Sequence, residues 1–596
     1  MDQRPLCTGP VLLVGEGDFS FSCSYVHVCK TWGEMFTTSL LNETDIVARH
    51  SQVEKNVSYL KEQGATVLFS TDATSLELHD VLKDITFSRI IFNFPHAGGK
   101  SNIKKNRKLI KEFCISASHL LTENGDICVT LCKGQGGTPV DHPRAWHNTW
   151  QVVSMAAEAG LILNKVHPFC AEKFPSYSST GFRSQDKHFH TDGALTHVFI
   201  KTKTQVQVPL FSLDSSSACD QQTCPGSKAV GDIRKDNQDT DQHSVIPDCG
   251  IKALLANNIY FKGKMEPNFL CAKNHPIGRT ASDICEALIS NTDMEKQLPV
   301  MTDIYNAKFS HHLRDLTMCS CSKYSQFVDN IVYKKGTYDA RYSHSQTKIS
   351  MFRSFSDSFP INREGLPVAH ECMVICHKDQ NTTRLHIRLL QMVKTFLAKK
   401  TVNLLTHEQL ISENKFLYSL KFCDKFDLSH VIASQSAMNN HLLGFTGNFK
   451  CCTNTDIAVL LLDPIAVMRY DIPNVRLLWS TEDKVCNELE RVCTESEPFI
   501  LTSLFPPVWQ HDMSFWLKGE SFDIMNMFNI VRNCTDDLVI EMSLTDTYKD
   551  TETRKTSYCF RFLYQSFDRA LPYSKAHQLQ SMLRLAIAQG MNIVLR

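Results

Sequence analysis

A pair of glycines lies close to the N-terminus, directly after a run of apolar residues. Gly15 and Gly17 end the strand-like stretch "PVLLVGEG" and are followed by Asp18. Glycine has no Cβ, so the backbone at such a strand end can approach a ligand closely. Ser20 occupies the place of the third glycine in the dinucleotide-binding fingerprint, and a tight structural turn explains the pattern equally well. Gly15, Gly17 and Asp18 are therefore candidate cofactor-binding residues.

Polar residues also follow the later strand-like stretches. Asp72 comes after "GATVLFST", where it is placed to hydrogen-bond an adenine amino group. Asn93 and His96 come at the end of "SRIIFNFPH". The residue that binds ribose hydroxyls is expected after the second strand, where "TTSLLNETD" offers Glu43, slightly late in the sequence. No G-x-x-x-x-G-K-[ST] motif is present, which argues against a phosphate-binding P-loop.

The elements that must position these residues alternate along residues 8–203. Strand-like runs such as "SRIIFNFP", "GDICVTLC" and "LTHVFIKT" are separated by stretches with helical spacing, such as "EKNVSYLKEQ" and "HNTWQVVSMAAEAG". The strands are continuously apolar rather than alternating, which favours a parallel sheet covered by helices on both faces. We therefore predict a Rossmann-like α/β domain over residues 8–203.

Residues 8–203 resemble the S-adenosylmethionine-dependent rRNA uridine-N3 methyltransferase family. The resemblance is carried by "LLVGEGDFSFS", "DAT", "RIIFNFPHAGGK", "NRKLIKEF", "GDICVTLCKGQ" and "YSSTGFRSQD", in that order. It implies S-adenosylmethionine as the cofactor and RNA as the partner, with methyl transfer to N3 of a uridine. In class I methyltransferases the residues after the fourth strand, here Asn93 and His96, face the methyl acceptor.

Each candidate substrate residue has an alternative structural role. His96 accepts the N3 proton, which the unperturbed pKa of a histidine suits, or it caps the following turn. Asn93 hydrogen-bonds the uracil edge, or it satisfies backbone groups before a proline. Asn106 and Arg107 bind substrate phosphate, or they form the solvated start of a helix. The glycine-rich segment 133–148 is long for a strand–helix connection and is a candidate substrate lid.

The rest of the chain divides at a change in composition. Residues 204–250 are polar and nearly free of aromatic residues, which predicts a disordered linker. Residues 251–495 regain globular composition, with "ISMFRSF" and "TRLHIRLLQMVKTFLAKK" as helix-like segments and "DIAVLLLD" as a strand. Residues 503–596 follow the order β-α-β-β-α-β if a short strand forms at "MNIVL", which is the ferredoxin-like arrangement.

Residues 515–571 resemble the ferredoxin-fold anticodon-binding domain that ends phenylalanyl-tRNA synthetases. The resemblance implies RNA contacts on the sheet face and nearby loops, with Arg554, Lys555 and Arg561 at phosphates and Tyr558 near a base. Acidic and basic residues nearly balance across this domain, so its affinity for RNA is expected to be modest. A protein-interaction role for the same face is the alternative.

The stretch 459–479, "VLLLDPIAVMRYDIPNVRLLW", resembles the last class II synthetase motif of the same enzymes. That family has a glycine, an aliphatic residue, an acidic residue and then an ATP-binding arginine. Here the four places hold Leu461, Leu462, Asp463 and Pro464. Residues 251–495 are therefore expected to form a degenerate, α+β synthetase-like domain.

Composition excludes several other classes. The 596 residues include 63 basic and 63 acidic side chains, so nucleic acid must be bound by local patches. The 23 cysteines show no paired C-x-x-C motifs, which argues against a zinc site and for reduced thiols. The longest apolar run is broken by Asp463 and Pro464 and is too short for a membrane span. We expect a cytoplasmic protein, with the nucleolus as the alternative.

These observations leave three functional hypotheses. The first is an RNA methyltransferase acting on rRNA, which follows from the N-terminal resemblance. The second is the same activity on tRNA, which follows from the C-terminal resemblance. The third is a non-catalytic RNA-binding or scaffold protein that has kept the fold.

The degenerate synthetase motif predicts that the protein does not activate phenylalanine. A proline supplies no guanidinium for the triphosphate, and the missing glycine closes the approach of ATP. Purified protein should therefore show no phenylalanine-dependent ATP–pyrophosphate exchange when a phenylalanyl-tRNA synthetase is assayed alongside it. Exchange above the background without phenylalanine would contradict this prediction.

Overall fold

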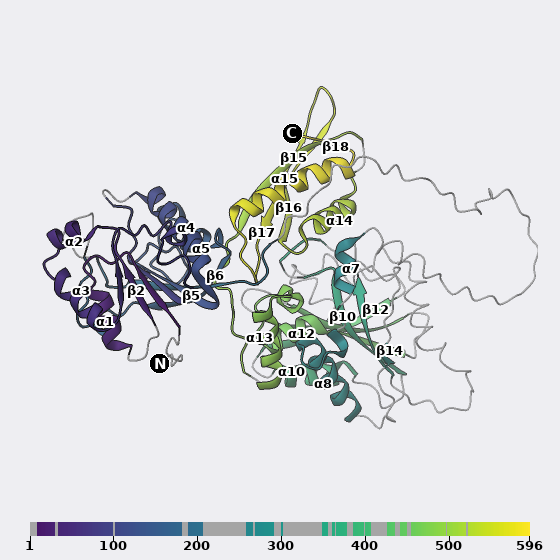
Figure 1. Ribbon diagram of the computed structural model, residues 1–596. Coiled ribbons are helices and arrows are strands. Elements are labelled where there is room, and N and C mark those ends of the chain that lie inside the picture. The colour runs from purple at the N-terminus through teal and green to yellow at the C-terminus, as the bar shows by residue number, and fades with distance from the viewer. Residues whose placement is uncertain are drawn as a thin grey trace, which may run out of the picture.

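The computed structural model describes three regions, each built on its own sheet (Figure 1). The residues described are 9–29, 34–98, 102–180, 189–206, 258–265, 267, 269–290, 300–301, 348–355, 360–363, 365–377, 385–397, 400–406, 426–434, 441–449, 455–495, 497–519 and 522–596. Most of the predicted linker, residues 207–250, lies outside these ranges. Its first residues are ordered, because the backbone N–H of Thr204 donates to Glu482 at 3.0 Å and Val206 is buried in the C-terminal core.

The N-terminal region is a seven-stranded sheet with the order β3-β2-β1-β4-β5-β7-β6. Its strands are β1 (Val11–Val14), β2 (Met35–Thr38), β3 (Thr66–Leu68), β4 (Phe87–Asn93), β5 (Leu121–Leu131), β6 (Leu161–Pro168) and β7 (Leu195–Lys201). Strands β1 to β5 pair in parallel, as predicted. Strand β7 instead runs antiparallel between β5 and β6, so the sheet is mixed and this strand departs from the predicted parallel arrangement.

Helices cover both faces of this sheet. The helices are α1 (Ser20–Val28), α2 (Glu43–Arg49), α3 (Val53–Glu62), α4 (Ile103–Leu120) and α5 (Val152–Ala157). Alternation along β1 shows the two faces, since Val11 and Leu13 pack with α1 to α3 while Leu12 and Val14 pack with α4 and α5. All four side chains are buried, which explains why the strand is continuously apolar.

The central region is a second seven-stranded sheet with the order β11-β12-β13-β14-β10-β9-β8. Its strands are β8 (Val300–Met301), β9 (Lys348–Phe355), β10 (Val368–His377), β11 (Val402–Thr406), β12 (Phe426–Ser434), β13 (His441–Phe449) and β14 (Thr455–Leu461). Its helices are α7 (Ile259–Met265), α8 (Pro276–Ser290), α10 (Leu385–Phe396), α12 (Leu462–Arg469) and α13 (Asp483–Glu495).

One predicted helix of the central region is a strand. The segment "ISMFRSF" lies in β9, which pairs antiparallel with β10 over eight residue pairs. The helix prediction was wrong because pairing with a neighbouring strand outweighs a short local pattern. The helix predicted around residue 390 and the strand predicted at "DIAVLLLD" are present as α10 and β14.

The degenerate motif lies where β14 runs into α12. Asp463 and Pro464 are in the first turn of α12, a helix position that tolerates proline. The Asp463 carboxylate is buried and accepts the backbone N–H of His370 at 2.6 Å, with the His370 ring Nδ1 at 3.1 Å. This acidic side chain therefore joins α12 to β10.

The C-terminal region has the predicted ferredoxin-like fold. Its elements are β15 (Trp509–Leu517), α14 (Ile524–Thr535), β16 (Val539–Lys549), β17 (Thr556–Tyr564), α15 (Tyr573–Gly590) and β18 (Ile593–Leu595). The sheet order is β16-β17-β15-β18, and every pairing is antiparallel. Phe515 and Phe562 of the sheet share one core with Val531 of α14 and Leu579 of α15. Both helices therefore lie on the same face of the sheet (Figure 1).

The C-terminal region is joined to both of the others. The N–H of Leu504 donates to the carbonyl of Leu163 at 2.6 Å, and Leu504 and Phe505 pack on the core of the N-terminal region. On the central side, the buried ammonium of Lys264 lies 2.5 Å from Asp537.

Two classes of feature are absent from the ranges that the structure describes. None of the helices there combines the length and the apolar character that a membrane crossing requires. No group of three or more histidine, cysteine, aspartate or glutamate side chains there is arranged to hold a metal ion.

The buried contact between Asp463 and His370 gives a stability prediction. Asp463→Ala leaves the buried N–H groups of His370 without an acceptor, which costs about 1–3 kcal/mol for each lost hydrogen bond. The thermal midpoint of the full-length protein should fall, measured by differential scanning fluorimetry. Glu286→Ala, on an exposed position of α8, is the matched control and should leave the midpoint unchanged. Equal midpoints for the two variants would contradict the prediction.

Candidate active site

The predicted site residues gather at one edge of the N-terminal sheet. Strands β1 to β4 run parallel, so the turns that follow them lie at the same edge. Backbone hydrogen bonds link these turns, from Glu16 N–H to the Thr38 carbonyl at 2.8 Å and from Thr71 N–H to the Ser39 carbonyl at 2.9 Å. The residues predicted after separate strands are therefore neighbours in space.

The two glycines of the first turn have different roles. Gly15 is exposed and has a φ of 71°, a left-handed conformation that favours glycine, and a Cβ there would lie 2.4 Å from the Phe92 ring. A Cβ on Gly17 would lie 2.5 Å from Oγ1 of Thr180. Gly17 therefore allows a close approach by the chain's own segment, whereas the backbone at Gly15 is exposed.

Asp18 supports the start of α1. Its Oδ1 accepts the backbone N–H of Ser20 at 3.0 Å and the Ser20 hydroxyl at 2.6 Å. The Asp18 side chain is buried, and its backbone carbonyl accepts from Asn56 at 2.8 Å. These contacts give the predicted cofactor ligand a positioning role in the glycine turn. Ser20, which these bonds to Asp18 fix, occupies the place of the third glycine in the dinucleotide-binding fingerprint.

Glu16, between the glycines, has an unusual titration and was missed by the sequence reasoning. Burial raises the pKa of its carboxyl to about 7, although the Ser22 N–H donates to it at 3.1 Å. The nearby charge of Asp18 raises the same pKa further. A carboxylate that ionises near neutral pH at a strand-end turn is a typical feature of functional sites. The signal in the sequence was an acidic residue placed between two glycines after a buried strand.

Asp72 and Glu43 are both exposed at this edge. Asp72 uses Oδ1 to accept the N–H and hydroxyl of Thr74, each at 2.8 Å, which fixes the carboxylate. Glu43 is the first residue of α2, and Asn42 caps that helix by accepting from Asp45 N–H at 2.8 Å. The exposed side chain of Leu40, in the same turn as Glu43, adds an apolar surface that the sequence reasoning overlooked.

Asn93 carries the most specific polar geometry of the site. Its Oδ1 accepts the Thr130 hydroxyl at 2.7 Å, and Thr130 is 3.0 Å from the hydroxyl of Thr196. Because the Thr130 proton is given to Asn93, the proton between the two threonines must come from Thr196. This chain of hydroxyls fixes the amide so that Nδ2 points away from Thr130. Nδ2 is buried and has no hydrogen-bond partner within the described ranges.

The turn after Asn93 is strained and is shaped by His96. Phe94 has a φ of 49°, which is uncommon for a residue other than glycine, and its N–H donates to the Thr130 carbonyl at 2.9 Å. The His96 Nδ1 accepts the N–H of Gly98 at 3.0 Å. This contact matches the turn-capping alternative for His96. In the neutral ring only the nitrogen without a proton can accept a hydrogen bond, and here that nitrogen, Nδ1, already accepts from Gly98.

Asn106 and Arg107 have structural contacts instead of a free surface. Asn106 is buried in α4, and its Oδ1 accepts the N–H of Ala97 at 2.9 Å. The Arg107 guanidinium donates to the carbonyls of Thr149 at 2.6 Å and His147 at 2.9 Å. The structure therefore favours neither phosphate binding nor a solvated helix start for these two residues.

The predicted lid, residues 133–148, is fastened at several points. The buried Asp141 carboxylate accepts the N–H groups of Gly134 at 2.7 Å and Gly136 at 2.9 Å. Arg107 holds the other end of the segment from α4. These bonds argue against a lid that opens freely. Of the two tryptophans in and just after this segment, Trp150 is buried whereas Trp146 is 53% exposed.

A second segment closes over the site from the side of α1. Ser178 N–H donates to the Ser20 hydroxyl at 2.9 Å, and Thr180 lies against Gly17. Ser179 is bonded to Phe189 through the Phe189 N–H at 2.9 Å, and the Phe189 ring stacks on Phe94 at 5.6 Å. The stretch "YSST", residues 177–180, thus contacts the glycine turn. The rest of that motif, residues 181–186, lies outside the described ranges.

The predicted RNA-binding residues of the C-terminal domain differ in their availability. Arg554 and Lys555 are exposed in the hairpin between β16 and β17. Arg561 lies on the open face of the sheet, where it forms a bidentate ion pair with Asp512 at 2.8 and 2.9 Å. Tyr558 is half-buried on the opposite, helix-covered face, where its ring packs near Phe515 and Phe522, so it does not share the open face with Arg561.

An aromatic and cationic cluster on the open face was not anticipated from the sequence. The rings of Trp516 and Tyr548 lie 5.8 Å apart, and the Arg596 guanidinium is 5.5 Å from the first and 5.8 Å from the second. These residues come from β15, β16 and the C-terminus. Aromatic faces and guanidinium groups together are typical of surfaces that bind single-stranded nucleic acid.

Two family models match parts of the chain, one in the N-terminal region and one in the C-terminal region. Residues 12–181 match the family described as rRNA (uridine-N3-)-methyltransferase BTM5-like, and residues 503–596 match the ferredoxin-fold anticodon binding domain. The chain therefore combines an N-terminal methyltransferase-like domain with a C-terminal anticodon-binding-type domain, which confirms both resemblances.

Similarity extends over the whole chain in two mammalian proteins. Ferredoxin-fold anticodon-binding domain-containing protein 1 of Homo sapiens is 27% identical over 646 residues, covering 98% of this chain and 99% of that protein. Its Mus musculus homolog is 29% identical with the same coverage. The mitochondrial phenylalanine–tRNA ligase of Mus musculus is 30% identical over 133 residues, which are 22% of this chain and 29% of the ligase.

The raised pKa of Glu16 predicts a pH-dependent stability. The folded state favours the protonated carboxyl of Glu16, which adds to the free energy of unfolding. This stabilisation is fully present below the ordinary pKa of 4.5 and is lost as pH rises through about 7. Between pH 5 and 8 the wild type should therefore lose stability relative to Glu16→Gln, which stays neutral. Thermal midpoints measured across this range test the difference, with the exposed Glu43→Gln as control. Parallel curves for wild type and Glu16→Gln would contradict the prediction.

Proposed function

We propose that this protein is an S-adenosylmethionine-dependent RNA methyltransferase that modifies N3 of a uridine. The observation that carries the proposal is the oriented, unpartnered amide Nδ2 of Asn93 at the carboxyl edge of a methyltransferase-like sheet. A buried donor without a partner costs about 1–3 kcal/mol, so its retention calls for a ligand acceptor. The carbonyl groups that flank N3 of uracil are acceptors of this kind.

The residues at this edge fit the cofactor. Gly15 offers an exposed backbone in a left-handed turn, and Asp72 offers an exposed carboxylate for the adenine amino group. The exposed side chain of Leu40 provides an apolar surface for a base. When bound, S-adenosylmethionine supplies a methyl group activated by a sulfonium. The ionised form of Glu16 would stabilise positive charge on the cofactor, so cofactor affinity should rise with pH through about 7.

Positioning is the main contribution that the chain makes to the reaction. Methyl transfer to N3 is an in-line displacement that releases the N3 proton to water, so its rate depends on holding the acceptor nitrogen in line with the methyl group. Thr196 and Thr130 fix the Asn93 amide, and Asn93 in turn orients the uracil through its Nδ2. The uridine must be unpaired to reach this edge, because N3 is occupied in a base pair.

The RNA partner follows from both domains. Arg554 and Lys555 in the exposed hairpin and the cluster of Trp516, Tyr548 and Arg596 give the C-terminal domain local contacts for a strand. The N-terminal family favours rRNA as the substrate. The anticodon-binding family of residues 503–596 supports tRNA as the second candidate. A non-catalytic RNA-binding role is the remaining alternative. A measurement of cofactor binding distinguishes it from the methyltransferase.

Cofactor binding and methyl transfer test this proposal separately. At about 100 times its dissociation constant, S-adenosylmethionine should add about 2.7 kcal/mol to stability. Asp72→Asn should reduce that thermal shift, because it keeps the bond to Thr74 but replaces the free acceptor oxygen. Asn93→Ala should keep the shift while lowering methyl transfer to cellular RNA about tenfold or more, measured with radiolabelled cofactor.

The controls follow from the same contacts. Thr196→Val, which removes only the end of the hydroxyl chain, should lower the rate less than Asn93→Ala. Gly17→Val is a poor test, since its side chain would collide with Thr180 and disturb the fold. Absence of any thermal shift with the cofactor would reject the enzyme and leave the non-catalytic alternative.

A further inference from the structure

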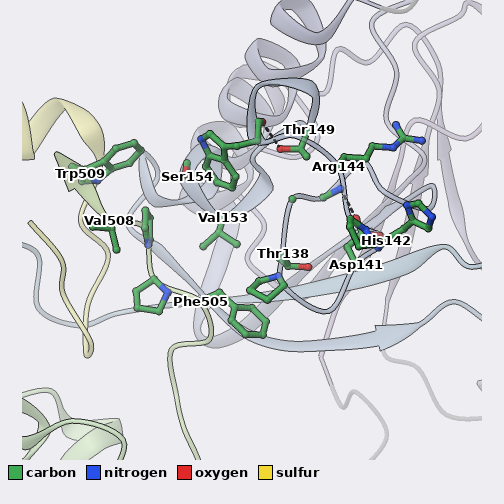
Figure 2. Close-up of a pocket in the computed structure, with 17 residues that line it drawn as sticks. Thr138, Asp141, His142, Arg144, Thr149, Val153, Ser154, Phe505, Val508 and Trp509 are labelled. Atoms are coloured by element: carbon green, nitrogen blue, oxygen red, sulfur yellow. Dashed lines mark hydrogen bonds between the residues drawn. The ribbon is translucent and has the colours of Figure 1, made fainter. Parts of the chain in front are cut away.

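A cavity of about 660 Å³ lies between the N-terminal and C-terminal domains, away from the predicted cofactor residues. One wall comes from the segment after β5 and the start of α5, and the other comes from residues 505–509 (Figure 2). Its size falls in the range of small-molecule sites. We call it the domain-boundary pocket.

The floor of the domain-boundary pocket carries two hydroxyls without partners. Thr138 is 6% exposed and Ser154 is 1% exposed, and both side chains line the cavity. Thr138 Oγ1 and Ser154 Oγ have no hydrogen-bond partner within the described ranges. Buried hydroxyls are normally paired, so two unpaired ones in one pocket indicate polar groups of a ligand. A hydroxyl both donates and accepts, which suits the mixed edge of a nucleobase.

The walls of the pocket are apolar and aromatic. Val153, Phe505 and Val508 line it, together with two tryptophans, Trp146 and Trp509. Trp146 is 53% exposed although it is a large apolar side chain, so its indole is available to a partner. The Trp509 indole is fixed, because its Nε1 donates to the Leu571 carbonyl at 2.8 Å. Aromatic side chains of this kind bind unstacked bases through their faces.

The electrostatics of the rim favour an anionic ligand. His142 and Arg144 lie at the end of the pocket opposite Trp509 and Val508 (Figure 2). No carboxylate in the described ranges lies within ion-pair distance of Arg144. The one acidic lining residue, Asp141, already accepts the N–H groups of Gly134, Gly136 and His142. A cation is therefore available to the ligand, whereas the carboxylate oxygens are already engaged by the backbone.

We propose that the domain-boundary pocket holds one unstacked nucleotide of the RNA substrate, with its base between the tryptophan walls and its phosphate toward Arg144. The ligand touches both domains, so it links the strand held by the C-terminal domain to the catalytic edge of the N-terminal one. This inference rests on the proposed function in taking RNA as the substrate. A free nucleotide has the same chemistry, and the experiment below separates the two sources.

The first experiment locates a bound strand on the full-length protein. A single-stranded RNA of about 12 nucleotides carrying one 4-thiouridine is photo-crosslinked, and the modified peptides are identified by mass spectrometry. Crosslinks within residues 136–154 or 505–509 are expected. Crosslinks confined to the hairpin of Arg554 and Lys555 would overturn the proposal.

The second experiment measures RNA affinity by fluorescence anisotropy. Trp146→Ala should weaken binding about tenfold, as expected for the loss of one base stack. Val508→Trp should weaken it similarly by filling the cavity from an exposed position. Arg144→Glu should weaken binding and flatten its dependence on salt. Lys55→Glu, an equal charge change on the exposed face of α3, is the control and should change affinity least.

The outcomes separate this inference from the proposed function. Each variant should keep the thermal shift with S-adenosylmethionine, which also shows that it is folded. Unchanged RNA affinity in both Trp146→Ala and Val508→Trp would overturn the pocket while leaving the methyltransferase in place. Uridine 5′-monophosphate that binds in a Trp146-dependent way, when the RNA does not, would identify a free-nucleotide site and overturn the assignment to a strand.

Discussion

The parallel pairing of β1 to β5 is the constraint on which the candidate site depends. Parallel strands end at the same edge, so the turns after them are brought together however far apart they are in the sequence. The pairing also requires crossover helices, which here cover both faces and bury every residue of β1. Gly15, Asp72 and Asn93 are thereby held on one framework. Thr74 then orients the Asp72 side chain from the same turn, and Thr130 on the neighbouring strand orients that of Asn93.

The sequence predicted the architecture of the two outer domains well, because their strands and helices carry strong periodic patterns. The β-α-β-β-α-β order of the C-terminal domain and the parallel part of the N-terminal sheet are both present. Sequence-based prediction failed where the structure of a segment is decided by its pairing with a distant segment. The antiparallel direction of β7 and the strand at 348–355 are set by their partners, and no local pattern fixes either one.

The same distinction holds for the site. Residue type and position after a strand were enough to select Asn93 and Asp72. They were not enough to foresee that Arg107 would bind carbonyls, that Asn106 would be buried, or that Tyr558 would face the core. The raised pKa of Glu16 also depends on burial by residues far away in the chain. Polar side chains have several possible partners, and only the folded structure chooses among them.

The packing of Leu504 and Phe505 on the core of the N-terminal domain means that the border between the family matches is not a physical border. A fragment ending near residue 203 would expose apolar surface that the full chain covers, and it would lose the strand-like bond to Leu163. Part of the hydrophobic core of the methyltransferase-like domain is thus covered by a segment about three hundred residues further along the chain. Ala570 of the C-terminal domain is likewise buried with Ala157 and Ile162, so removing either domain would expose apolar side chains of the other.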